Sequence, residues 1–326
     1  MDVPGPPEGL SAFAARVLDQ LSISAWLPAA VLVAGLFFLL KVRFNEGDLW
    51  ATLADVGNTR GSTIVLLGAA VILLTTVTQA FEFTSVRVLE GYWGDGFLRS
   101  AAAGVLARIQ LRRWRRAVDR RKRALRDSFE SAREGLVRAK VSPEVIAYLG
   151  ADIRDEFPLP SLSDAQEAEL NETDWRSSAS PELMRRLDAL DGVLDRMPRR
   201  HRILPTRLGN TMRSYEDTAN RLVTGSVSGM VQRVFHRLPR HIQIELDQYR
   251  NRLGLYAALV AVTSLLALVA ASVVAPSALS AGLILSVLAV VGCAVFYGAA
   301  VSSADAYGSL LVEAMQIANA VDSRTT

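Results

Sequence analysis

Long apolar stretches alternate with polar ones along this 326-residue chain. Two apolar stretches lie near the N-terminus, and a third runs without a charged residue from Leu253 to Ala304. A helix that crosses the hydrocarbon core of a bilayer needs about 20 apolar residues. The third stretch is therefore long enough for two helices, with a turn between Pro276 and Gly282. The pattern predicts four transmembrane helices, over residues 24–42, 62–82, 254–275 and 280–301.

Neither a soluble helical core nor a signal peptide fits these stretches as well as membrane helices do. Buried helices of a soluble protein seldom remain uncharged for so long, and this chain has three such runs. A cleavable signal peptide has a short basic segment before a short apolar one. Here the first apolar run is long, and the segment before it is neither short nor basic.

The region between the second and third predicted spans has the marks of helices. Ser-Pro-Glu occurs at 142–144 and at 180–182, which predicts an N-cap, a proline in the first turn and an acid near the helix N-terminus. A third helix is predicted after Thr206, a further N-cap. Two apolar stripes have helical spacing: Leu183, Leu187, Leu190 and Leu194, then Leu208, Met212, Tyr215 and Ala219. No alternating strand pattern appears, so the predicted fold is an all-α polytopic membrane protein.

Two predicted spans extend beyond the membrane. The third keeps helical phase from Pro239 without a breaker until Pro276. The second runs on to the glycines Gly94 and Gly96. Both are expected to project from the bilayer as rigid stalks.

Charge predicts the orientation. Residues 83–253 contain 31 of the 36 Lys and Arg residues and 23 of the 33 Asp and Glu residues. Because basic residues near membrane ends stay in the cytoplasm, both termini and this region are expected there. The preference for Arg over Lys is typical of a GC-rich bacterial genome, so the inner membrane of a bacterium is predicted. The expected parts are a cytoplasmic segment (1–23), a transmembrane hairpin (24–82), an Arg-rich helical domain (83–253), a second hairpin (254–301) and a cytoplasmic tail (302–326).

The strongest charge run is LRRWRRAVDRRKRALR, residues 111–126, with nine basic residues and one acid. A basic helix close to a membrane is attracted to anionic lipid headgroups by about 1 kcal/mol per charge. The run predicts headgroup contact by Arg112, Arg113, Arg115, Arg116, Arg120 and Arg121. Two alternatives remain open: a solvated helix face with nearby acidic partners, and nucleic-acid binding, which a membrane tether disfavours.

The sequence LEGYWGDG, residues 89–96, ends the second predicted span. Glu90, Tyr92 and Trp93 are predicted at the membrane interface, where amphipathic rings collect, and Trp114 in the basic run also suits that position. The glycines do not predict a phosphate loop, because the Lys-Ser/Thr signature and a preceding strand are both missing.

A polar network is predicted in ILPTRLGNTMRSYEDTA, residues 203–219, where it would fix one helix against a neighbour or another subunit. Its members are Arg207, Asn210, Arg213, Glu216 and Asp217, with Arg213 spaced to pair with either acid. No nucleophile stands beside a base. The three histidines lack metal spacing, and the single cysteine, Cys293, lies in a predicted span. No catalytic residue, metal or cofactor is therefore predicted.

Ionisable residues are nearly absent from the predicted spans, which disfavours a coupled transporter. Glu82 and Asp305, at span ends, are expected to pair with arginines; the partners considered are Arg87, Arg250 and Arg252. The polar residues of the second span are compatible with a pore lining and equally with a hydrogen-bonded bundle interior; they include Thr75, Thr76 and Gln79.

Three motifs occur in a fixed order: LEGYW at 89–93, LPTRLGN at 204–210 and SADAYGSLLVEAMQIANAVD at 303–322. Together they resemble a family of bacterial membrane proteins with four spans, a large domain between the second and third, and no assigned activity. The resemblance covers the chain from about residue 60, and LPTRLGN is its most specific part. It implies that residues 204–210 and 90–93 matter to a shared architecture rather than to a known reaction.

These features predict a non-enzymatic membrane scaffold that forms a homo-oligomer and presents its helical domain to a protein partner. The alternative is an oligomeric ion channel whose basic region forms an anion-favouring vestibule. Bestrophin-like channels have a similar plan, which is an analogy at the level of the fold. An enzyme ranks third, and nucleic acid is not expected as a partner.

Overall fold

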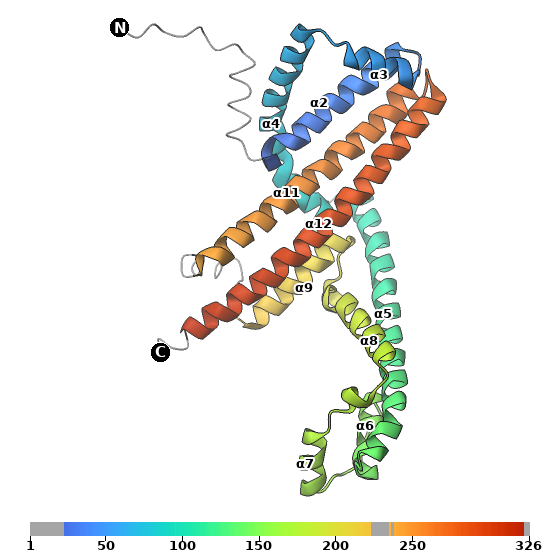
Figure 1. Cartoon of the computed structure of the whole chain (residues 1–326), viewed down its shortest axis with the longest axis vertical. Coiled ribbons are helices and arrows are strands. Elements are labelled where there is room, and N and C mark those ends of the chain that lie inside the picture. The colour runs from blue at the N-terminus through green and yellow to red at the C-terminus, as the bar shows by residue number, and fades with distance from the viewer. Residues whose placement is uncertain (1–22, 95, 223–234, 236–237, 323–326) are drawn as a thin grey trace. The chain divides into compact units, whose positions relative to one another are not determined.

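The computed structural model describes residues 23–94, 96–222, 235 and 238–322 (Figure 1). The predicted segment 1–23 lies almost wholly outside these residues. The described residues form helices and turns and no strand, which confirms the all-α class. The α-helices are α2 (Ile23–Phe44), α3 (Leu49–Gly57), α4 (Gly61–Glu90), α5 (Phe97–Arg138), α6 (Pro143–Ile153), α7 (Asp164–Glu172), α8 (Pro181–Asp195), α9 (Arg207–Leu222), α11 (Arg240–Val269) and α12 (Leu279–Asp322).

Four helices are long and apolar enough to cross a membrane. They cover Ala25–Phe44, Gly61–Glu90, Arg240–Val274 and Leu279–Ile317. The four predicted spans are thereby confirmed, and a helical region lies between the second and the third. The protein is a multi-pass membrane protein.

The third and fourth spans belong to long continuous helices that run side by side (Figure 1). Helix α11 starts after Pro239 and continues through a π-helical turn, Ala270–Val274, as predicted from the lack of breakers. Helix α12 continues to Asp322, so most of the predicted tail is helical.

The second span continues beyond residue 82 as one helix, as predicted, but this extension is shorter than predicted. Helix α4 stops at Glu90, before the glycines Gly94 and Gly96 where the sequence pattern predicts the break. Gly91 has a φ of 98°, a left-handed conformation that favours glycine. The amide of Tyr92 donates to the carbonyl of Arg87 at 3.0 Å, which closes the last turn of the helix.

Two compact units make up the chain. Unit 1 contains residues 1–100 and 206–326, and unit 2 contains residues 101–205. The predicted boundaries of the cytoplasmic domain, 83 and 253, concern sides of a membrane and stay a prediction.

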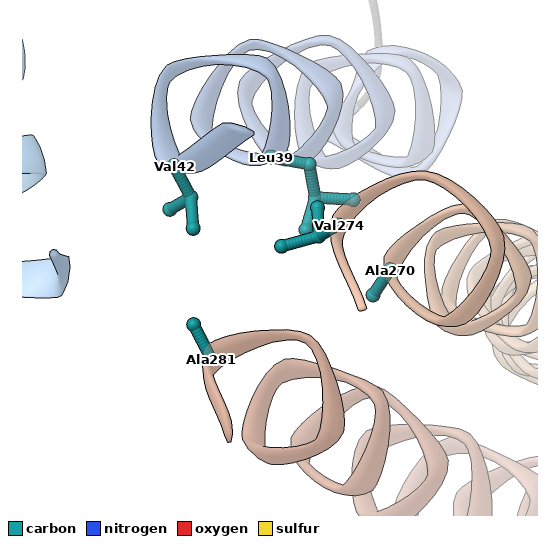
Figure 2. Close-up of a cluster of buried hydrophobic side chains, with 5 residues drawn as sticks. All are labelled: Leu39, Val42, Ala270, Val274 and Ala281. Atoms are coloured by element: carbon teal, nitrogen blue, oxygen red, sulfur yellow. The ribbon is translucent and has the colours of Figure 1, made fainter. Parts of the chain in front are cut away.

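In unit 1, the turn between α11 and α12 packs against α2. Figure 2 shows the buried cluster there: Leu39, Val42, Ala270, Val274 and Ala281. The side chain of Leu266 packs directly on the backbone of Gly35, because a Cβ on Gly35 would lie 2.6 Å from Cδ1 of Leu266. Small residues matter in membrane bundles because lipid gives little hydrophobic drive for helix association.

Unit 2 has an apolar core of its own. Phe129 and Leu136 of α5 pack with Ile146 of α6, and the ring of Trp175 meets that of Phe129 edge-on at 5.6 Å between centroids. Among the described residues, three ion pairs join α5 to the rest of the unit: Arg121 with Asp191, Lys122 with Asp155, and Glu130 with Arg154.

The Ser-Pro-Glu motifs start α6 and α8 as predicted, with proline in the first turn. Neither serine side chain caps its own helix, however. Ser142 donates instead to Glu169 of α7, from its amide at 2.8 Å and its hydroxyl at 2.6 Å. The amide of Ser180 donates to Oγ of Ser131 at 3.0 Å. Both serines therefore connect elements of unit 2.

Candidate functional site

The start of α9 is held by α12. The hydroxyl of Thr206 accepts from the amide of Gly209 at 3.1 Å, which confirms the predicted N-cap. The amides of Arg207 and Leu208 donate to the phenol oxygen of Tyr297, at 3.0 and 3.3 Å. The first amides of a helix have no partner within it, so Tyr297 supplies what the helix lacks.

An apolar cluster lies beneath this start. Leu208 is fully buried, in contact with Leu253 of α11 and with the α12 residues Ala300 and Ala304. Leu89, from the last turn of α4, packs on the same cluster. Leu89, Leu208 and Ala304 belong to the three motifs noted in the sequence. The motifs thus meet in one place, which we call the α9 junction.

In the middle of α9, the ring of Tyr215 packs on Gly308 of α12. A Cβ on Gly308 of α12 would lie 2.9 Å from Cβ of Tyr215, so only glycine leaves room for this ring. The hydroxyl of Tyr215 donates to Oδ1 of Asp305 at 2.8 Å. Hydrogen bonds to charged groups contribute about 1.5–3 kcal/mol. Backbone contact and a charge-assisted bond therefore fix the same side chain.

The far end of α9 is apolar. Ala219 is fully buried against Leu311 and Met315 of α12. The predicted stripe of Leu208, Met212, Tyr215 and Ala219 therefore faces α12.

Glu90, the last residue of α4, interacts electrostatically with residues of α9. Its carboxylate is attracted by Arg87 of its own helix and by Arg213 of α9, and it is repelled by Glu216. Glu90 thus lies within electrostatic reach of α9, and its predicted role at a membrane interface stays a prediction.

The rest of LEGYW completes the end of α4. The indole Nε1 of Trp93 donates to the carbonyl of Val88 at 2.7 Å. The guanidinium of Arg87 lies 5.0 Å from the centre of the Tyr92 ring, a cation–π distance. The motif is therefore a helix end whose aromatic residues fold back on the last turn.

A second carboxylate joins α4 to α11. The side chain of Glu82 lies on the backbone of Gly254, where an added Cβ would be 2.6 Å from the Glu82 carboxyl carbon. Arg250, one of the predicted partners, attracts this carboxylate from one turn away on α11. For Asp305, Tyr215 is a partner in the structure, and pairing with an arginine stays a prediction.

The predicted network residues lie on α9 in different surroundings. Asn210 and Asp217 are buried, Arg213 and Glu216 are half-buried, and the side chain of Arg207 is exposed. The pairing of Arg213 with Glu216 or Asp217 stays a prediction. Residues from other helices complete the site: Tyr297, Gly308 and Gly254. Gly308 belongs to the third sequence motif, and the sequence pattern did not single out the other two.

The remaining predicted residues lie elsewhere. Thr75 is buried, and its hydroxyl donates to the carbonyl of Val71 at 2.8 Å, whereas Thr76 and Gln79 are exposed on α4. The basic run lies on α5. Arg121 pairs with Asp191, Trp114 is half-buried, and the other five arginines predicted to contact headgroups are exposed: Arg112, Arg113, Arg115, Arg116 and Arg120.

The α9 junction joins helices, and its hydrogen bonds and apolar contacts form no reactive set. Among the residues that the structure describes, no three His, Cys, Asp or Glu side chains gather where they could hold a metal ion. What the junction can do is hold α9 in register on α12 and against α4. Comparisons with protein-family models, with curated proteins and with solved structures gave no match.

Proposed function

We propose that this membrane protein is a non-enzymatic scaffold of a bacterial inner membrane. It self-associates through its spans and presents the helical unit 2 to a protein partner in the cytoplasm. The resemblance carried by LEGYW and LPTRLGN supports this proposal, because each motif builds a helix end at the α9 junction rather than a reactive site.

The observation that carries the proposal is the docking of α9. Unit 2 is inserted between α4 and α9, and its last residue, Pro205, directly precedes the Tyr297-held start of α9. The chain therefore returns from the insertion to an element fixed on the spans. Because α9 is fixed on the spans, the C-terminal end of unit 2 is anchored to the membrane part of the protein, as expected of a scaffold that presents this unit to a partner.

Self-association is supported by the second span. Thr76 and Gln79 are three residues apart on α4, so they share one helix face, and both are exposed in the single chain. Lipid offers a carboxamide no hydrogen-bond partner, and such side chains in membranes commonly bond across helices. A second copy of α4 would supply the partner.

The same two residues favour the second candidate, an oligomeric anion channel. A ring of subunits could place Thr76 and Gln79 along a polar path, with the basic surplus of residues 83–253 at its mouth. Thr75 contributes less to this alternative, because its hydroxyl is bonded within its own helix.

Ion flux separates the two candidates. The full-length protein would be reconstituted in liposomes with anionic lipid, and chloride and potassium flux measured after insertion is verified by protease protection. The scaffold predicts flux equal to that of protein-free vesicles. Chloride-selective flux that changes in Gln79→Leu, but not in the control Leu73→Ile on the exposed face of α4, would overturn the scaffold and establish the channel.

A further inference from the structure

One exposed stripe along a face of α5 is apolar in its first turns and basic in the turns that follow. Its first members, Val105 and Ile109, are apolar and exposed, and they follow Phe97, which is 84% exposed. The next members are arginines, also exposed: Arg112, Arg116 and Arg120. Because the spacings are four, three, four and four residues, all five side chains lie along one helix face.

The internal ion pairs of unit 2 do not use this stripe. The basic residues of the run that pair with acids are Arg121 and Lys122, which point to Asp191 and Asp155. Within the described part of the chain, no ion pair is formed by Arg112, Arg116 or Arg120. The apolar cluster of unit 2 uses other α5 residues, Phe129 and Leu136. The stripe is therefore available to a partner outside the chain.

Chain connectivity keeps the apolar turns close to the bilayer. Helix α5 begins at Phe97, seven residues after the end of the second span at Glu90. An extended chain of that length reaches at most about 25 Å. Helix α4 is 30 residues long, or about 45 Å, and exceeds the 30 Å hydrocarbon core. The charged residues of α4, Glu82, Arg87 and Glu90, all lie in its last turns, so the excess length is expected at this end of the helix.

We propose that the first half of α5 lies on the surface of an anionic bilayer. Phe97, Val105 and Ile109 enter the interface, and the arginine stripe contacts the lipid phosphates. Apolar side chains alone would fit any membrane, and a basic stripe alone would fit nucleic acid. Their succession on one face beside a membrane span favours a negatively charged lipid surface. This contact goes beyond the scaffold function, since a channel would make it equally.

The test places an environment-sensitive fluorophore on the full-length protein. Cys293→Ser removes the single native thiol and keeps a hydroxyl beside Ser264, whose oxygen lies 3.3 Å from the Cys293 sulfur. A fluorophore attached to Ile109→Cys then reports the environment of the stripe. Val137→Cys is the matched control, an exposed apolar position on the same helix about 42 Å further along its axis. Both proteins are reconstituted in vesicles with brominated lipid, with and without phosphatidylglycerol.

Quenching is expected at position 109 and not at 137, only with phosphatidylglycerol, and it should weaken in high salt. Arg112→Gln with Arg116→Gln should lower the ratio of lipid-bound to free helix about fivefold per charge removed. The control Arg185→Gln with Arg186→Gln, exposed residues of α8, should not. Equal quenching at 109 and 137, or quenching indifferent to phosphatidylglycerol, would overturn the proposal. So would a spectral change at 109 produced by added DNA and not by anionic lipid.

Discussion

Gly308 shows how a single missing side chain decides the position of a helix. The ring of Tyr215 occupies the space that any larger residue at 308 would need, and its hydroxyl reaches Asp305 on the same helix. In a membrane bundle, where lipid competes with side chains for apolar contact, close backbone approach and hydrogen bonds carry much of the packing. The α9 junction combines both in one residue pair.

Gly308→Ala should therefore loosen α9. The new Cβ would lie 2.9 Å from Cβ of Tyr215, and overpacking of this kind costs about 1–3 kcal/mol. Hydrogen exchange of α9 amides, measured by mass spectrometry, should accelerate by about 5- to 150-fold, the factor that this energy gives.

Gly298→Ala is the matched control on the same helix, since nothing lies within 4 Å of a Cβ at that position. Its α9 exchange should equal that of the unsubstituted protein. Unchanged α9 exchange in Gly308→Ala would contradict the role assigned to the Tyr215 ring.

At the scale of elements, hydrogen bonds join α7, a helix with no buried residue, to the rest of unit 2. Glu169 of α7 accepts both the hydroxyl and the amide of Ser142, at the start of α6. These two hydrogen bonds, the hydroxyl's first, lower the pKa of Glu169 below its ordinary value of 4.5. The pKa of Asp155 is lowered as well, by the hydrogen bond and charge of Lys122.

A carboxylate with a lowered pKa stabilises the folded state above its unfolded pKa, and that contribution is lost as pH falls through the folded pKa. Exchange of the amides around Ser142, corrected for the intrinsic rate, should therefore rise as pH falls below 4.5. Glu169→Gln should remove this pH dependence. Glu172→Gln, an exposed carboxylate of the same helix, should leave it in place. Identical pH dependence in Glu169→Gln would assign the effect to another group, with Asp155 the first to examine.

The helices could be predicted from the sequence, and their contacts only in part. Uncharged length predicted the spans, and Thr206 with its apolar stripe predicted the start and buried face of α9. The end of α4 was misplaced because Gly91 is a single glycine before two aromatic residues, whereas the Gly-rich 94–96 resembles a stronger break. Composition alone does not say which of two nearby glycines ends a helix. Here the contacts of Tyr92 and Trp93 with the last turn of α4 accompany an end at Gly91.

The α9 junction was harder to predict, because its partners lie about 90 residues apart. Tyr297 and Gly308 look like ordinary members of an apolar helix, and nothing in their local spacing relates them to α9. Asp305 was noted for its charge, and its tyrosine partner was not foreseen. The three motifs were the available signal: their order pointed to a shared architecture, and the structure shows them meeting at one cluster.

At the scale of the whole molecule, the proposed scaffold assembles through its spans. Helix α4 contributes few buried residues to unit 1, and many of its apolar side chains are exposed along with Thr76 and Gln79. Exposed apolar residues suit lipid equally well as protein. The polar pair does not suit lipid, so the scaffold proposal places a second copy against this face.

Disulfide trapping in native membranes tests this assembly. In a Cys293→Ser background, Gln79→Cys should form a covalent dimer on mild oxidation, because two copies of α4 meet at that face. Phe81→Cys, exposed on the opposite face of α4, should stay monomeric. Dimer at position 79 and none at 81 is the outcome expected of the scaffold. No dimer at 79, or equal dimer at both positions, would contradict a specific assembly through α4.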